Sequence, residues 1–229
     1  MKIRHYIIIP FVILMLIFGL GSFSKGHLDN ISIVTCLEIR KLSGDLYTVR
    51  AEIADTVGSA ESGTSQSNIL SANGPSIGEA FLQLSRLDSS SIYTGHVRLI
   101  LYDLAAARED GFEELSEFIL DTKDIRFNVP VALYDADSGD ILEAETLITG
   151  NKGLDLERGI RNAVSEKTNV SSEAFQVINS VGDEDYRLSL PVISIRETGD
   201  KTVAYIDDTA VFYGGEFQRR GGIDSHDSR

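Results

Sequence analysis

A continuous series of patterned segments across residues 74–124 most constrains the fold of this 229-residue chain. The first segment begins at Gly74-Pro75, where a proline fits the first turn of a helix because the N–H that it lacks is not needed there. Ser76 and Glu79 follow at the spacing of a capping box. The next apolar residues recur at helical steps, so the sequence predicts an amphipathic helix with one buried stripe: Ile77, Ala80, Phe81, Leu84 and Leu87.

A strand and two helices follow within the same stretch. Val97, Leu99 and Leu101 alternate with residues that are not uniformly polar, which predicts an interior strand covered on both faces. A short helix is expected from Leu104 to Arg108, and a second helix after Gly111. The second helix has three carboxylates near its start, where they favour the macrodipole, and we interpret them as a solvated face: Glu113, Glu114 and Glu117.

Strand patterns precede this stretch, and both strands and helices follow it. Two alternating segments, 31–38 and 47–53, predict a hairpin that turns at Ser43-Gly44-Asp45. The polar residues 58–73 predict a mobile loop, or alternatively a flap that contacts a ligand or a partner subunit. Beyond the stretch, a strand is expected around 129–133, and Pro130 places it at an edge or gives it an irregular start. A turn and a short helix through Ala144 follow.

The rest of the chain predicts two helices, with apolar stripes within 156–164 and 174–181, and then two strands, around 190–195 and 203–212. We therefore expect an α+β fold in which a mixed sheet has flanking helices. A first domain would span 28–149 and a smaller α+β unit 150–214, because the run Gly150 to Gly153 is the clearest break between patterned segments. The last segment, 215–229, has little apolar content and is expected to be a disordered tail.

The first 26 residues form a hydrophobic segment. Lys2 and Arg4 precede an apolar run from Tyr6 to Leu20, which has the length of a long signal-peptide core or, with the next residues, of a short spanning helix. The basic residues before the run favour export of everything that follows. The sequence predicts either a retained membrane anchor or a cleaved signal peptide, with the body of the protein outside the cytoplasm.

Net charge excludes two classes of partner. The chain carries −14 overall, and beyond residue 26 it holds 18 basic and 35 acidic residues, a balance of −17. Nucleic acids and anionic membrane surfaces repel such a body, so neither is expected to bind it directly. Basic partner surfaces and divalent cations remain compatible with this charge.

No residue pattern amounts to an active site. Residues 74–78, GPSIG, match the letters of a nucleophile elbow, but a polar segment precedes them where that elbow needs a hydrophobic strand, so Ser76 is interpreted as a helix cap. Residues 135–145 hold five carboxylates without the order of an EF-hand loop, which predicts a solvated acidic turn. No histidines or cysteines have metal-ligand spacing. The chain is therefore expected to be noncatalytic, with no cofactor and no metal.

Two single residues complete the set of candidates. His96 follows Gly95 at the start of the predicted interior strand. Its ring is expected to bond the neighbouring chain there, or alternatively to contact a partner or respond to pH. Cys36 is the one cysteine, so no internal disulfide forms, and its place within a predicted strand makes it a small buried hydrophobe.

A family resemblance extends this reading. The segments SANGPSIGEAFLQLSR, YTGHVRLILYDLAAAREDGFEELSEFILDTKDIRF and VPVALYDADSGDIL, between residues 71 and 142, resemble the amino-terminal part of the C subunit of Ger-type germinant receptors of spore-forming bacteria. The later pieces LPVIS and TAVFYGGEF extend the resemblance. It rests on the order of weak features over a long stretch and not on any one motif.

The resemblance implies a function and partners. It implies a noncatalytic subunit of a nutrient germinant receptor at the spore inner membrane, whose partners are a larger membrane subunit and a transporter-like multispanning subunit. Two departures from the family accompany the resemblance: LGSFSKGHLDNISIV lacks the lipid-bearing cysteine of the family, and the resemblance covers only the amino-terminal part of its C subunits, short of their larger third domain. The membrane tie would then depend on the N-terminal helix. The alternatives are an exported solute-binding or adhesion module and a membrane-tethered enzyme.

Overall fold

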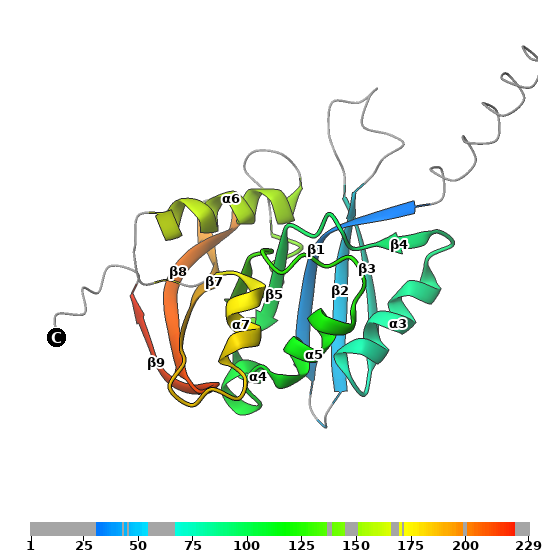
Figure 1. Cartoon of the computed structure of the whole chain (residues 1–229). Helices are drawn as coiled ribbons and strands as arrows, with labels where there is room; N and C mark the ends of the chain where they lie inside the picture. Colours follow the sequence, from blue (N-terminus) through cyan, green and yellow to red (C-terminus); the bar gives the residue numbers. More distant parts are fainter. Residues whose placement is uncertain are drawn as a thin grey trace, which may run out of the picture.

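The computed structural model shows one mixed sheet with helices on both of its faces (Figure 1). It describes residues 31–42, 44, 46–54, 67–136, 139–144, 151–165, 170, 172–198 and 201–222. The expected signal or anchor segment, 1–26, lies outside the described residues. Among the residues that are described, no helix is long and apolar enough to cross a membrane.

The sheet begins with the expected hairpin. Strands β1 (Ile31–Leu42) and β2 (Leu46–Ala54) pair antiparallel, with a bulge between Val34 and Cys36. An edge strand, β3 (Ser67–Gly74), pairs along the whole of β2. The prediction of a loop was therefore wrong for residues 67–73. Their Ser- and Asn-rich side chains show little strand pattern, but their backbone groups form hydrogen bonds with β2 and so hold the segment as a strand.

The middle of the sheet is parallel. Strand β5 (Leu99–Asp103) lies between β1 and β6 (Val131–Tyr134), and β6 pairs in turn with β7 (Arg187–Thr198). Every residue of β5 and β6 is buried, which confirms the predicted interior strand. The edge alternative for Pro130 was wrong, whereas the irregular start is present: Pro130 forms an isolated bridge with Glu173 just before β6. The short β4 (Ser91–Tyr93) pairs with the start of β1.

The far side of the sheet ends in a second antiparallel group. Strand β8 (Lys201–Tyr213) pairs with β7 as predicted, and β9 (Glu216–Gly222) pairs with β8 at the edge. The prediction of a disordered tail was wrong for 216–222. This segment is held by backbone pairing and by Phe217, which meets Phe212 edge to face at 5.5 Å between ring centroids. Residues 223–229 lie outside the described part of the chain.

Helices cover the two faces unequally. Four of them pack on one face, which we call the four-helix face: α3 (Ile77–Leu87), α4 (Leu104–Glu109), α5 (Glu113–Asp121) and α7 (Ala174–Ser180). The opposite face, which we call the α6 face, packs against α6 (Lys152–Ser165) (Figure 1). The helices confirm the predicted ones, but residues 141–144 form turns where a short helix was expected, and Leu87 is 62% exposed.

The side chains of each strand alternate between two cores. Leu37, Tyr102 and Leu133 belong to the core under the four helices, whereas Cys36, Leu101 and Tyr134 belong to the core under α6. Cys36 is completely buried, as predicted. The mixed sheet with flanking helices is confirmed, but helices connect parallel central strands, so the arrangement is mixed α/β and not α+β.

The sheet also continues past the expected domain boundary. Strands from residues 31–134 and from 187–222 are joined in it by the pairing of β6 with β7. The boundary itself, at Gly150, lies outside the described residues. A division into two folding units at this point stays a prediction, which hydrogen exchange can test by comparing the opening free energies of β2 and β8.

Candidate functional site

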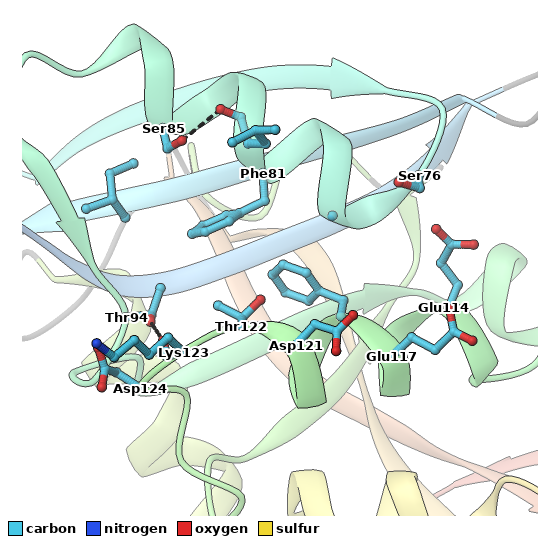
Figure 2. Close-up of a pocket in the computed structure, with 14 residues that line it drawn as sticks. Ser76, Phe81, Ser85, Thr94, Glu114, Glu117, Asp121, Thr122, Lys123 and Asp124 are labelled. Atoms are coloured by element: carbon cyan, nitrogen blue, oxygen red, sulfur yellow. Dashed lines mark hydrogen bonds between the residues drawn. The ribbon is translucent and has the colours of Figure 1, made fainter.

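A groove between helices α3 and α5 is the candidate binding site. It encloses about 530 Å³ and is closed at one end by the β4 segment and the loop that follows α5 (Figure 2). An apolar floor and a polar rim are both present, as is common in ligand and partner sites. The floor consists of Phe81, Leu82, Ile92 and Phe118, and the rim includes Glu114, Glu117, Asp121 and Asp124.

The start of α3 is fixed in place by two side chains. The Ser76 hydroxyl accepts a hydrogen bond from the Glu79 N–H at 3.1 Å, which is the cap that the sequence predicted. From α5, a carboxylate oxygen of Glu114 accepts the Ile77 N–H at 3.0 Å, and Figure 2 shows Glu114 below the start of α3. The expectation of a solvated face was therefore wrong for Glu114, because its carboxylate accepts a hydrogen bond from a backbone N–H that has no partner within α3 itself.

Two aromatic rings join the helices along the floor. Phe81 of α3 meets Phe118 of α5 edge to face, with 5.5 Å between ring centroids. Leu82, on the α3 side, stays 43% exposed. Gly78 also lines the groove, and a Cβ added to it would meet no atom within 4 Å. The groove thus keeps open space above a firmly packed floor.

The rim of the groove is acidic. Glu117 and Asp121 lie one turn apart on the exposed side of α5, and Asp124 follows in the next loop (Figure 2). Within the described part of the chain none of these three carboxylates has an ion pair or a hydrogen bond. Lys123 is the one basic residue that lines the groove. The rim therefore presents negative charge that the fold itself does not neutralise.

The closed end of the groove contains a backbone irregularity. The Thr94 hydroxyl donates to the Lys123 carbonyl at 2.6 Å and so ties the β4 segment to the loop after α5. Asp124 has φ of 72°, and no other non-glycine residue of the described chain has a positive φ. Aspartate tolerates this left-handed conformation better than most residues, but it still carries a cost. The loop that ends the acidic rim is therefore held in one specific conformation.

A second cluster of charged groups lies on the α6 face, and it is internally satisfied. Glu52 is fully buried, and its two carboxylate oxygens accept the N–H groups of Lys152 at 2.7 Å and Gly153 at 2.9 Å. The Thr35 hydroxyl donates to the same carboxylate at 2.7 Å. A carboxylate at the start of a helix satisfies free N–H groups and favours the macrodipole, so Glu52 caps α6 from strand β2.

Arg50 organises the neighbouring part of this cluster. Its guanidinium pairs with Asp140, with Glu143 at 3.2 Å and with the buried Glu38 at 3.4 Å. Burial tends to lower the pKa of Arg50, but its bonds to Asp140 and the charges of the carboxylates outweigh this and raise it. The acidic turn is therefore paired with Arg50 and is not simply solvated; Asp137 and Glu145 lie outside the described residues.

Three buried groups in this cluster keep their protons more tightly than usual. Burial raises the pKa of Glu38, and the charge of Arg50 offsets part of that rise. Burial likewise raises the pKa of Tyr134 and of the Cys36 thiol. The negative charges of Glu52 and Glu38 raise the pKa of the Cys36 thiol further. Glu38 Oε2 and the Tyr134 hydroxyl are buried without a hydrogen-bond partner in the described structure, although each shifts the pKa of the other.

The residues that the sequence singled out do not converge on a catalytic site. The prediction that His96 opens the interior strand and bonds the chain there was wrong: it lies in an exposed turn before β5, and its ring contacts Tyr93 at 5.6 Å between centroids. A strand, β3, does precede Gly74, contrary to the sequence reading, but the Ser76 hydroxyl is used as a helix cap. No group of three potential metal-binding side chains is found among the described residues.

The groove itself was missed at the sequence level. Phe81, Phe118 and the carboxylates were assigned to helix faces, but nothing in a single sequence shows that α3 and α5 lie side by side. One signal for the rim is present in the sequence: Glu117 and Asp121 are four residues apart on one helix, and like charges at this spacing destabilise a helix, so helix stability does not explain the pair.

Comparison with known proteins identifies the family of this chain. The family model described as the spore germination protein N-terminal domain matches residues 24–195, which cover both the groove and the Glu52 cluster. No match was found among curated proteins or among solved structures. Proteins of the matched family are noncatalytic receptor subunits, which confirms the expectation that the chain is not an enzyme. With more than half of its length matched in this way, the chain belongs to the family of the spore germination protein N-terminal domain.

Proposed function

We propose that the chain is a noncatalytic, membrane-anchored subunit of a nutrient germinant receptor and takes part in spore germination. The observation that carries this proposal is the family match over residues 24–195. The structure is compatible with a subunit that works by binding, because its described part has an open groove and internally paired buried charges. Deleting the gene should abolish or slow germination with one class of nutrient and leave nutrient-independent germination intact.

We assign the attachment of the protein to the membrane to its N-terminal segment. The apolar run from Tyr6 to Leu20 follows basic residues, which favours the extracytoplasmic side for the body. The spore inner membrane is the location that the resemblance to germinant receptor subunits implies. Removing residues 2–26 should move the protein from the membrane pellet to the soluble fraction. Sequencing the N-terminus of the mature protein distinguishes a retained anchor from a cleaved signal peptide, and a cleaved, freely soluble protein would contradict the anchor.

The partners are assigned as the two other receptor subunits, a larger membrane subunit and a transporter-like multispanning subunit. Genes for both are expected beside the gene for this chain. Affinity purification of the full chain from detergent-solubilised spore membranes should recover both subunits. A monodisperse protein that recovers neither would contradict the receptor proposal and favour an exported solute-binding or adhesion module.

A further inference from the structure

We propose that the groove between α3 and α5 binds a basic, amphipathic segment of a protein partner. The inference rests on the proposed function only for the identity of that partner, which would be another receptor subunit. It follows from three independent features of the groove: the row of unpaired carboxylates, the exposed apolar floor and the empty space above Gly78.

The carboxylates form a row and not a single point. Glu117 and Asp121 are separated by about 6 Å along the helix axis, since each residue adds about 1.5 Å, and Asp124 follows them in the next loop. A single ammonium group reaches only carboxylates within about 4 Å. Several cations in series are therefore needed to neutralise the row, and a lysine- or arginine-rich segment supplies them.

The floor between the two helices requires an apolar component in the same ligand. Phe81 is only partly buried, and Leu82 is 43% exposed beside it. A ligand with charge alone would leave these side chains in water. A segment with apolar residues on one side and basic residues on the other covers the floor while its cations meet the rim, which is how amphipathic helices fill grooves.

Gly78 keeps the space for this ligand open. Its φ is not positive and an added Cβ would contact nothing, so neither the backbone nor packing requires a glycine. Glycine is also among the poorest helix formers, and alanine would serve α3 better. A larger side chain at this position would project into free space that the ligand otherwise occupies. Gly78→Leu is therefore a blocking variant that leaves the fold intact.

Binding can be measured with a defined probe. The full chain, purified in detergent, is titrated with a fluorescent 14-residue helix of leucine and lysine in which the two types lie on opposite faces. Gly78→Leu and Glu117→Lys should each weaken binding at least about tenfold. Glu109→Lys changes the net charge equally but lies outside the groove, and should weaken binding less than about threefold.

Three results would overturn the proposal. Equal losses in Glu117→Lys and Glu109→Lys would show that the probe senses only the overall acidic charge. Equal binding of a probe whose leucines are replaced by serine would show that the floor takes no part. Full competition by spermine at the affinity of the probe would make the groove a site for small polycations.

Failure of this inference can be told from failure of the proposed function. If Gly78→Leu no longer binds the probe but the unchanged chain recovers no membrane subunit from spore membranes, the binding role of the groove is supported and the receptor assignment fails. If Gly78→Leu still recovers both membrane subunits in full, the receptor assignment stands and the groove does not bind them.

Discussion

The two faces of the sheet use acidic residues in opposite ways. On the α6 face, Glu52 and Glu38 are buried, and the N–H groups of α6 and the guanidinium of Arg50 compensate their charge. On the four-helix face, Glu117 and Asp121 are exposed on the rim of a groove and have no partner within the described chain. The comparison indicates that the carboxylates that stabilise the fold are paired within the protein, whereas the unpaired carboxylates of the groove are available to bind another molecule.

The largest effect is expected from Glu52→Ala. The substitution leaves the N–H groups of Lys152 and Gly153 without their acceptor, whereas the Thr35 hydroxyl keeps the backbone carbonyl of residue 52, at 3.2 Å. Each buried unsatisfied group costs about 1–3 kcal/mol, so the free energy of unfolding should fall by about 2–6 kcal/mol. Urea unfolding followed by circular dichroism measures this.

Glu143→Ala provides the matched control for that variant. Its side chain is 69% exposed and pairs with Arg50 on the same face of the sheet without capping α6, so the loss should be below about 1 kcal/mol. A comparable loss in both variants would show that Glu52 does not act as the cap of α6.

A smaller loss is expected from Gly153→Ala. A Cβ at this position would lie 2.7 Å from the Thr35 carbonyl oxygen and 3.0 Å from Cys36 Cβ, so α6 must shift away from β1. Overpacking of this kind costs about 1–3 kcal/mol. The paired variant Gly78→Ala on the groove side should not destabilise the protein, because its Cβ meets nothing; a loss there above about 1 kcal/mol would contradict the open groove.

The buried carboxyl of Glu38 should make stability depend on pH. Burial raises its pKa in the folded state above the ordinary value of 4.5, so the folded protein holds this proton more tightly than the unfolded chain does. Its contribution to stability is complete below the unfolded pKa and is lost as pH rises through the folded pKa. Glu38→Gln should therefore gain stability relative to the parent above that window.

Urea midpoints measured for both proteins from acid to neutral pH test this expectation. Glu143→Gln is the control, since its exposed carboxylate contacts the same Arg50. A difference between the parent and Glu38→Gln that stays constant across the pH series would show that the pKa of Glu38 is the same in the folded and unfolded states, and would contradict the raised pKa.

The smallest effect on stability is expected at the groove rim. Glu117→Gln removes the repulsion of a carboxylate from Glu113 and from Asp121, each four residues away on α5, and should raise stability by about 0.2–0.5 kcal/mol per pair. Thermal unfolding resolves such a gain when the variant and the parent are measured side by side. A clear loss of stability would mean that Glu117 has a structural role and that the two faces do not differ.

Local patterns in the sequence predicted much of the fold but not the site. Helix α3 and strand β5 were predictable because apolar periodicity and the Ser76 cap are local features. Strands β3 and β9 were not, since their polar, glycine-containing residues are held by pairing with distant strands. The cap of α6 joins Glu52 to residues about a hundred positions away, and no local pattern reports such a contact.

The same limit applies to the groove. The chemistry of its rim was visible as a run of carboxylates on one helix, but the apolar floor exists only because Phe81 and Phe118 meet across two helices. A single sequence does not show which helix faces pair. The resemblance supplied the family, and the structure supplied the surface through which a member of that family can act.

One measurement tests the central claim, that the unpaired carboxylates of the groove serve binding while the buried ones serve stability. The double variant Glu117→Lys/Asp121→Lys and the control Glu109→Lys/Glu113→Lys are purified from spore membranes, and the co-purified larger membrane subunit is quantified beside the urea midpoint of each. We predict that the groove variant loses at least about tenfold of the partner with an unchanged midpoint, while the control retains it. Equal retention, or equal loss, in the two variants would contradict the account.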